Sequence, residues 1–543
     1  MRGGRPAVNS HCFPFRQIPH STRLFLDFLE HTPSVRSFYP RSAHFLEWAN
    51  EEASRVQYPA DRRRQLADIL DRQNKAFGAS SQTFDNIAAF RSGAFAVVTG
   101  QQVGLFGGPA FSLYKALSAV KLSQEASNRG IRSVPIFWLA TEDHDLAEVS
   151  EVGVPAPDAQ RERLAVHLQA PEDAPVGTIH FGSEISELVS QLERILGPSE
   201  ALTALAECYR PGESFGTAFA KFFARVFADF GVILLDGSDP ELDHIASPLY
   251  EAAIKRNAEL NQALLNRDEQ LQSAGYHQQV HITSATTPLF LMRNGSRVPI
   301  QASAEEGTFV AGNEKITTAE LLALVADKPE SFSPNVLLRP VVQDYLLPTL
   351  TYIGGAAEVA YFAQAGVLHE KLLGRVTPVL PRFSATVIET KPQALLERYQ
   401  LSFSDLFHGP DVLRETIGSR LLDSGLQRSF DEASRAAERS MAAIRNALEK
   451  LDKTLVESAN NAESKIQHQL SSLRSRAARA ELRQSEVAER HARFLSNTLY
   501  PEKTLQEREV GGVYFFAKYG RELLNGLLSQ INPDCVDHQL VTL

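Results

Sequence analysis

Apolar runs of strand length alternate with helical periodicity in the first half of the chain. Residues 94–98 and 134–140 are two such runs, and residues 111–126 between them have the spacing of a helix. A strand, a helix and a second strand in this order predict a right-handed parallel βαβ unit. Residues 231–242 return to a buried strand, and residues 376–380 are also strand-like. We therefore predict an open α/β sheet.

Two stretches interrupt this pattern. Residues 151–182 are polar and contain Pro and Gly, which indicates an inserted excursion rich in strands. Residues 277–301 alternate between apolar and polar positions and carry an Asn294-Gly295 pair, which is a strong hairpin signal. Residues up to about Arg91 look helical instead. The predicted sheet is thus interrupted twice.

The C-terminal third has a different period. From about Ser429 onward, apolar residues recur at steps of three and four: Met441, Ile444, Leu448, Leu451 and Leu455, and then Ile466, Leu470, Leu473 and Ala477. This spacing is typical of a coiled-coil seam. A capping-box pattern at residues 454–457 separates the two runs, so we predict an antiparallel helical hairpin that turns near residues 452–454. The seam would serve dimerisation or, alternatively, a hinge inside one chain.

Charge and cysteine content narrow the class of protein. The net charge of −10 argues against a general nucleic-acid binder. The three cysteines lie far apart, with no CxxC pair and no evident disulfide framework, so we expect a reducing cytoplasm. No stretch approaches the ~18 apolar residues of a membrane span, and the N-terminus lacks a signal-peptide core. We expect a cytoplasmic protein with neither membrane nor nucleic acid as partner.

A glycine-dense loop joins the first predicted strand to its helix within residues 97–115. Gly104, Gly107 and Gly108 permit backbone shapes that other residues resist, and Pro109 suits a first helical turn. Because N–H groups at a helix N-terminus bind anions, we expect this loop to hold a phosphate or another anionic substrate group. The segment is neither a P-loop nor a GxGxxG fingerprint, and a tight strand-to-helix connection is the alternative.

Three polar residues accompany the loop. Gln101 and Gln102 are expected to add side-chain hydrogen bonds to the bound group. Lys115 lies one turn into the helix, where it would reach a phosphate or else be an ordinary surface lysine.

The second predicted strand ends in a run of ionisable residues: Glu142, Asp143, His144 and Asp145. Ligands of open parallel sheets bind beyond the carboxyl ends of the strands. His144 is the best proton carrier of the four, because its ordinary pKa is near neutral. A simple capping role for Asp143 is the alternative. A metal site is not favoured, because adjacent ligands rarely converge without a partner elsewhere.

A third cluster lies within residues 337–362, and its candidate residues are Arg339, Asp344, Tyr345, Gly354, Gly355 and Glu358. Arg339 is a fixed cation suited to a carboxylate or a phosphate. Gly354 and Gly355 form a second junction between glycine and a helix. Glu358 falls in the first turn of that helix, where pairing with the helix dipole explains it as well as a substrate contact does.

Together these clusters resemble the bacillithiol biosynthesis cysteine-adding enzymes, the BshC family. TGQQVGLFGGPAFSLYK is similar to the family's TGQQxGLxxGPxYxxxK signature, FWLATEDHDLAEV to its second motif and LLRPVVQDYLLPTLTYIGGAAEVAYF to its third. IPHSTRLFLDFL and LYPEKTLQER also look familial. The resemblance runs in order along nearly the whole chain.

The resemblance implies a Rossmann-type parallel sheet core with two connecting-peptide insertions and an antiparallel coiled-coil domain used for homodimerisation. The expected segments are an N-terminal helical segment (1–91), the first half of the core (92–150), the first insertion (151–230), a core continuation (231–276), a second, β-rich insertion (277–334), the second half of the core (335–390), the coiled-coil domain (391–500) and a segment that returns to the core (501–543).

The resemblance also implies a reaction, in which L-cysteine is joined by an amide bond to the glucosamine nitrogen of glucosaminyl malate to give bacillithiol. The family core is similar to class I aminoacyl-tRNA synthetases, which adenylate an amino acid with ATP. This chain has no HIGH or KMSKS motif and no cysteine cluster that would hold zinc. We expect ATP with Mg²⁺ as co-substrate, and no zinc.

In the expected mechanism, His144 or Asp143 deprotonates the amine and Arg339 holds the malate carboxylates. Asp344 or Glu358 would bind the amine or the sugar hydroxyls. Three alternatives stay open: a nucleotidyltransferase acting on another small substrate, a coiled-coil scaffold with a degenerate core, and a ligase that forms an acyl phosphate and releases ADP.

Overall fold

A computed structural model describes residues 9–156, 161–171, 173–421, 424–482 and 486–543. The chain divides into two compact units. The first unit contains the described residues up to residue 386, apart from residue 161, and residues 507–541. The second unit consists mainly of residues 387–506, and residue 161 also belongs to it.

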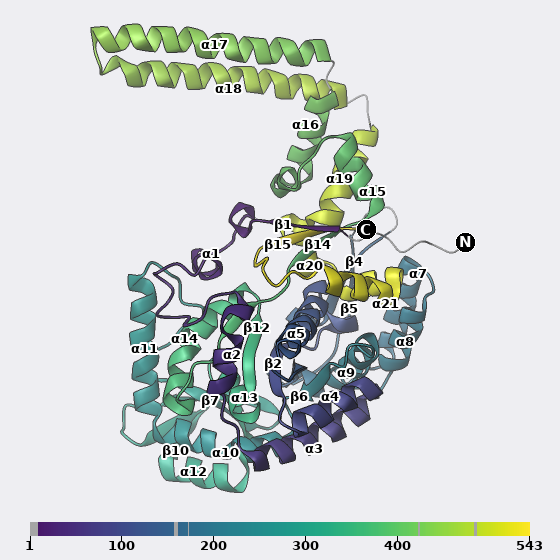
Figure 1. Ribbon diagram of the computed structural model, residues 1–543, viewed down its shortest axis with the longest axis vertical. Helices are drawn as coiled ribbons and strands as arrows, with labels where there is room; N and C mark the ends of the chain where they lie inside the picture. Colours follow the sequence, from purple (N-terminus) through teal and green to yellow (C-terminus); the bar gives the residue numbers. More distant parts are fainter. Residues whose placement is uncertain (1–8, 157–160, 172, 422–423, 483–485) are drawn as a thin grey trace. The chain divides into compact units, whose positions relative to one another are not determined.

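The first unit is built on a parallel five-stranded sheet (Figure 1). Its strands are β2 (Phe95–Gln102), β3 (Ser133–Ala140), β6 (Ile233–Asp236), β12 (Thr349–Gly354) and β13 (Val379–Pro381), in the order β13-β12-β2-β3-β6. The chain runs outward from β2 to β6 and then resumes at β12 on the other side of β2. This is the doubly wound, Rossmann-like order, and its switch point lies between β2 and β12. The predicted fold class is confirmed.

Helices cover the sheet because its central strands are apolar on both faces. The side chains of β12 are buried along its whole length. Helix α5 (Ala110–Asn128) packs against β2 and β3, while α3 (Ala60–Phe77) and α4 (Ser81–Arg91) pack against β6. α14 (Ala356–Leu373) follows β12 directly.

The first interruption combines a two-stranded sheet, β4 (Glu151–Pro155) with β5 (Arg161–Ala165), and the helices α7 (Glu184–Leu196), α8 (Glu200–Cys208) and α9 (Phe215–Val226). Two helices follow β6, α10 (Pro240–Lys255) and α11 (Asn257–Ser273).

The second interruption is an antiparallel sheet in the order β10-β9-β8-β7-β11. It contains β7 (Thr286–Arg293), β8 (Ser296–Ala302), β9 (Thr308–Ala311), β10 (Glu314–Thr317) and β11 (Phe332–Pro334), with α12 (Thr318–Asp327) before β11. The predicted hairpin is confirmed. Asn294 and Gly295 both have positive φ, as a tight turn between β7 and β8 requires.

The structure of the two ends of the chain differs from two predictions, one on the N-terminal region and one on the cysteines. The N-terminal region is not only helical: β1 (Asn9–Phe13) precedes α1 (Arg23–Leu29) and α2 (Phe45–Arg55), and it forms a sheet in the order β1-β15-β14 with β15 (His538–Thr542) and β14 (Ala385–Ile388). Cys12 and Cys535 are disulfide-bonded across 523 residues of sequence. The expectation of no disulfide framework was wrong because cysteine spacing gives no sign that the chain ends meet.

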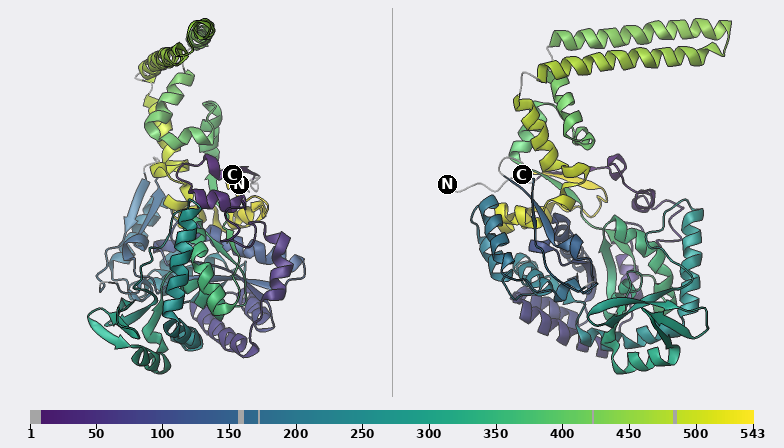
Figure 2. Two further views of the ribbon diagram at one scale, coloured as in Figure 1. Left: turned by 90° about the vertical axis from the view of Figure 1, so that its left-hand side faces the viewer. Right: turned by 180° about the vertical axis from the view of Figure 1, so that it is seen from behind.

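The second unit contains the predicted helical hairpin. Helices α17 (Ser424–Leu451) and α18 (Leu455–Leu482) run side by side (Figures 1 and 2), which confirms the turn expected at residues 452–454. Side-chain hydrogen bonds from Ser434 to Gln467 and from Arg474 to Asp431 cross between the helices. The unit also contains α15 (Thr390–Arg398), α16 (Pro410–Leu421) and α19 (Glu486–Leu499). Within the described part of the chain, no helix combines the length and apolar character that crossing a membrane requires.

Candidate functional site

A cavity of about 610 Å³ opens at the carboxyl edge of the parallel sheet, within the first unit. The ends of β2 and β3 both line it, through Gln101 and Gln102 on one side and Glu142, Asp143 and His144 on the other. The start of α14 and the β7–β8 hairpin complete the wall. Gln101 and Gln102 at the end of β2 and the ionisable residues after β3 therefore share one crevice, as the strand order predicts.

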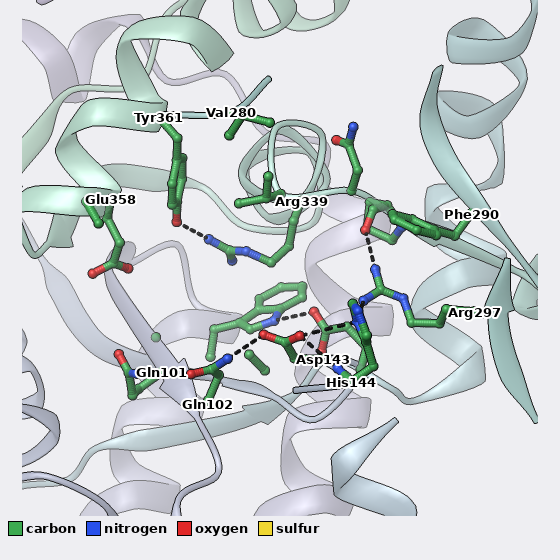
Figure 3. A pocket seen from close by; sticks show the side chains of 18 of the residues that line it. Gln101, Gln102, Asp143, His144, Val280, Phe290, Arg297, Arg339, Glu358 and Tyr361 are labelled. Atoms are coloured by element: carbon green, nitrogen blue, oxygen red, sulfur yellow. Dashed lines mark hydrogen bonds and ion pairs between the residues drawn. The ribbon is translucent and has the colours of Figure 1, made fainter. Parts of the chain in front are cut away.

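Asp143 is held in place by its neighbours (Figure 3). Its Oδ2 accepts a hydrogen bond from Nε2 of Gln102 at 2.7 Å, and its Oδ1 accepts one from the backbone N–H of His144 at 2.7 Å. Nε2 of Gln102 also donates to Glu148 at 3.0 Å. The carboxylate is thus oriented from two sides, and carboxylate oxygens keep further lone pairs for a substrate hydrogen.

Arg297 reaches the site from the β7–β8 hairpin, and sequence reasoning missed it. Its Nη1 lies 3.2 Å from Nδ1 of His144, its Nη2 donates to the carbonyl oxygen of Pro334 at 3.0 Å, and its guanidinium carbon lies 4.4 Å from the Phe290 ring centre. Because arginine only donates, Nδ1 of His144 is the acceptor and Nε2 carries the proton. Burial lowers the pKa of Arg297, although nearby carboxylates oppose that shift.

Glu142 is half-buried and has one buried oxygen without a hydrogen-bond partner among the described residues. Nε1 of Trp138 donates to its Oε1 at 3.3 Å, and its Oε2 has no hydrogen-bond partner among the described residues. Burial raises the pKa of Glu142, although the charges of Arg339 and Arg297 oppose that shift. A buried oxygen of this kind is available to a polar group of a ligand.

Lys115 is not a surface lysine. Its side chain is 1% exposed, and Nζ donates to the carbonyl oxygen of Gly100 and lies 2.5 Å from Oε2 of Glu358. Glu358 also accepts hydrogen bonds from the backbone N–H of Gly355 at 2.8 Å and from Oη of Tyr352 at 2.5 Å. Burial by itself would raise the pKa of Glu358, but the charge of Lys115 and these hydrogen bonds lower it. Glu358 therefore remains a carboxylate on the cavity wall.

Arg339 begins α13 (Arg339–Leu346) and lines the cavity. It donates to Oε1 of Gln343 and to Oη of Tyr361, both at 3.3 Å. Its guanidinium carbon lies 5.9 Å from the Trp138 ring centre and 5.8 Å from that of Tyr352. Figure 3 shows Arg339 pointing toward Tyr361. Burial raises the pKa of Tyr361 to about 12, so its hydroxyl stays protonated.

The glycine loop after β2 is not an open anion cradle, which corrects the prediction for Gly104, Gly107 and Gly108. The N–H of Gly107 donates to Oη of Tyr209 at 3.1 Å, and the N–H of Gly108 donates to the carbonyl oxygen of Leu105 at 3.0 Å. The N–H of Ala110, at the start of α5, donates to Val510. These glycines do not line the cavity, so the loop is the tight connection that was the alternative interpretation.

Three further candidates lie away from the cavity wall. Asp344 is buried, with its Oδ2 2.9 Å from Nε2 of His369, and Tyr345 lies under the guanidinium of Arg62, 3.6 Å from the ring centre. Asp145 caps the short helix α6 (Leu146–Val149) by accepting from the N–H of Glu148. The sequence pattern could not reveal which face of each helix meets the crevice.

Gly355 lines the cavity, whereas Gly354 does not. Gly354 is required for packing, because an added Cβ would lie 2.8 Å from Cβ of Glu358. No group of three or more His, Cys, Asp or Glu side chains among the described residues is arranged to hold a metal ion.

The fold and the site define a Rossmann-like α/β protein with a cavity at its switch point that several charged side chains line, and with a second unit that contains a helical hairpin. The family description "Bacillithiol biosynthesis BshC, N-terminal Rossmann-like domain" matches residues 9–383, and "Bacillithiol biosynthesis BshC, C-terminal coiled-coil domain" matches residues 385–543. The chain belongs to the BshC family.

Curated relatives agree over almost the full length. A protein of Koribacter versatilis (strain Ellin345) named "Putative cysteine ligase BshC" is 45% identical over 98% of this chain and 99% of its own length. Proteins with the same name from Solibacter usitatus (strain Ellin6076) and Salinibacter ruber (strain DSM 13855 / M31) are 36% and 32% identical, covering 98% and 95% of this chain and 99% and 96% of their own lengths.

Proposed function

We propose that this chain is a ligase that joins L-cysteine by an amide bond to the glucosamine amine of glucosaminyl malate, giving bacillithiol. Family membership supports the substrate class. The observation that carries the proposal is that an oriented Asp143, His144 and Arg339 all line one cavity. Holding two substrates together in one site contributes roughly 7–11 kcal/mol to such a reaction.

Asp143 is the better candidate for the group that takes the proton from the attacking amine. The lone pair of Nδ1 of His144 accepts a hydrogen bond from Arg297, so this nitrogen has no free lone pair with which to take the proton of the amine. Asp143 has no such conflict, and Gln102 holds its carboxylate toward the cavity. His144 then acts as a hydrogen-bond donor through Nε2, toward the oxygen on which negative charge develops.

Arg339 is proposed to hold a substrate carboxylate. Its positive charge is fixed, and its hydrogen bonds to Gln343 and Tyr361 set the orientation of its guanidinium group. Glu358 and Glu142 offer carboxyl oxygens to the amine or to sugar hydroxyls.

We also propose ATP, with Mg²⁺, as the co-substrate that activates the cysteine carboxylate, because condensing a free carboxylate with an amine in water is unfavourable. The residues of the glycine loop do not fit a nucleotide phosphate, since the N–H groups of Gly107 and Gly108 are already bonded.

Mass spectrometry of the purified chain tests the proposal. The chain is incubated with L-cysteine, glucosaminyl malate and Mg·ATP, and omission of each component is the control. Formation of bacillithiol with release of AMP supports carboxylate activation as an adenylate, and release of ADP supports an acyl phosphate. No product with cysteine, but pyrophosphate release with another substrate, would replace the proposal by a nucleotidyltransferase. A melting temperature that no substrate raises would favour the scaffold.

The helical hairpin is proposed to mediate homodimerisation. Ile444 and Leu451 on α17 are seven residues apart, as are Ile466 and Leu473 on α18, and all four are exposed, with Leu451 at 78%. Residues seven apart lie on the same side of a helix. Each helix therefore carries an apolar stripe that its hairpin partner leaves uncovered, and a second copy of the chain would bury it.

A further inference from the structure

Two arginines that the mechanism above does not use line the same cavity. Arg382 follows the last strand of the parallel sheet, β13, and its backbone N–H donates to the carbonyl oxygen of Gly354 at 2.9 Å. Its side chain passes the start of α14, because a Cβ added to Gly355 would lie 3.6 Å from Nε of Arg382. Arg508 comes from the short helix α20 (Gln506–Glu509).

Both guanidinium groups lie against one aromatic ring. The guanidinium carbons of Arg382 and Arg508 are 5.2 Å and 5.9 Å from the ring centre of Phe111, which also lines the cavity. Two like charges gathered at one ring repel each other unless an anion lies between or beside them. A cation stacked on an aromatic ring also has a defined plane, which favours paired contacts to planar or tetrahedral oxyanions.

Among the described residues, one carboxylate, that of Glu507, forms an ion pair with these two arginines. Nη2 of Arg382 donates to Oε1 of Glu507 at 2.6 Å, and Glu507 is fully buried and also accepts from Oγ of Ser384 and the backbone N–H of Ala385. Burial by itself would raise the pKa of Glu507, but the charge of Arg382 lowers it, so Glu507 is ionised. Among the described residues, no carboxylate lies within ion-pair distance of Arg508. The positive charge of Arg508 is therefore not balanced by a carboxylate of the described residues.

The first turn of α14 adds a partial positive charge at this end of the cavity, which favours a bound anion. Ala356 and Ala357 line the wall, and they are the first residues of an 18-residue helix. Glu358, in the same turn, accepts the N–H of Gly355, and its negative charge is compensated by Lys115. Backbone N–H groups at the start of a helix have no partner within the helix and favour an anion.

We propose that Arg382, Arg508 and the first turn of α14 form a subsite for a doubly charged oxyanion group of a substrate. The two carboxylates of a malyl group and the phosphates of a nucleotide share this chemistry. Arg339, which sequence reasoning assigned to the malate, is a single cation engaged with Tyr361, whereas this subsite supplies two cations. The identity of the natural ligand rests on the proposed function, but the existence of the subsite does not.

Binding of L-malate and of inorganic pyrophosphate to the full chain tests the subsite by isothermal titration calorimetry, with no cysteine and no turnover. L-Lactate, which carries one carboxylate, is the ligand control. Arg508→Ala is the main variant, because this side chain is exposed and its loss leaves the core intact. Arg508→Lys keeps the positive charge but removes the planar guanidinium that makes paired contacts to an oxyanion. Arg521→Ala is the matched control: it removes the same charge at a surface ion pair with Asp229 outside the cavity.

We expect Arg508→Ala and Arg382→Ala to weaken binding of at least one dianion tenfold or more, Arg508→Lys to weaken it less, and Arg521→Ala to change it less than twofold. Weakening for malate alone assigns the subsite to the malyl group, and weakening for pyrophosphate alone assigns it to a nucleotide. Unchanged affinity for both dianions in both arginine variants, or no binding of either to the unmodified chain at millimolar concentration, overturns the proposal. Arginine-dependent binding by a chain that forms no amide would refute the proposed function and leave the subsite standing.

Discussion

Nζ of Lys115 lies 2.5 Å from Oε2 of Glu358, and this buried ion pair joins the two halves of the parallel sheet at its switch point. Lys115 belongs to α5, which follows β2, and Glu358 belongs to α14, which follows β12. The pair therefore holds together the two helix starts that border the cavity. It also explains why a lysine one turn into α5 is buried.

Removing either partner should destabilise the fold strongly, because Lys115 is 1% exposed and Glu358 is 20% exposed, so the remaining charge loses its ion pair where little solvent reaches it. We expect Lys115→Met or Glu358→Gln to lower the free energy of unfolding by about 3–5 kcal/mol. The double variant should lose clearly less than the sum of the two single losses. Chemical denaturation measures all three. Lys255→Met, which breaks an exposed pair with Glu251, is the control and should cost about 1 kcal/mol or less. Additive losses at Lys115 and Glu358 would contradict the pairing.

Asp143 and His144 should differ in their effect on turnover. If Asp143 takes the proton, Asp143→Asn lowers kcat by ~10² or more, because the amide keeps the shape of the side chain but cannot accept the proton. His144→Ala should lower kcat less, since it removes only a hydrogen-bond donor. Steady-state kinetics with both substrates saturating compares the two variants. A larger loss for His144→Ala, with near-native turnover for Asp143→Asn, would return the base role to His144.

Gly107 should matter for stability rather than for binding phosphate. It has a φ of +89°, and an added Cβ would lie 3.1 Å from the Phe222 ring. We expect Gly107→Ala to lower the free energy of unfolding by about 1–3 kcal/mol, with the KM of each substrate unchanged. Gly130→Ala is a matched control, because its φ of +84° is similar but no atom outside its chain neighbours lies within 4 Å of the added Cβ. Intact stability with a raised KM for ATP would restore the anion cradle.

Asp243 should make stability depend on pH. Burial raises its pKa to about 8, although a hydrogen bond from Oη of Tyr250 opposes the shift. A carboxyl group whose pKa is raised by folding contributes stability that is fully present below its unfolded pKa near 4 and is lost as the pH rises through 8.

Asp243→Asn, which imitates the protonated acid, should therefore gain stability relative to the unmodified chain as pH rises, by up to about 1.4 kcal/mol per pH unit between 4 and 8. At pH 4 the unmodified chain and the variant should have similar free energies of unfolding. Urea unfolding at several pH values gives the difference. A constant difference across this range would show that Asp243 is ionised in the fold.

The exposed stripes of the hairpin should hold the dimer. Leu451→Glu together with Leu473→Glu should give a monomer by light scattering, because each charge would enter an apolar interface. Both side chains are exposed within the chain, so helix content by circular dichroism should not change. Arg439→Glu is a control substitution on the same hairpin. A dimer that survives the double change would favour a hinge within one chain.

The sheet could be predicted because its strands are nearly continuous apolar runs, and the β7–β8 hairpin because Asn294-Gly295 fixes the turn. Other features depend on contacts between residues distant in sequence. The glycine loop has the same pattern whether its N–H groups face a ligand or bond to Tyr209, and only the packing of α9 and its neighbours decides between them. Arg297 looked like any arginine on an alternating strand, because nothing local indicates that the hairpin reaches His144.

We infer that the amide bond forms in the cavity between the ends of β2, β3 and β12. A crystal structure of the chain with L-cysteine and glucosaminyl malate tests it most directly. We expect both ligands to lie in that cavity, with the glucosamine nitrogen within hydrogen-bonding distance of Asp143. Well-defined ligands bound elsewhere, with the space between Gln102 and Arg339 filled only by water, would contradict it.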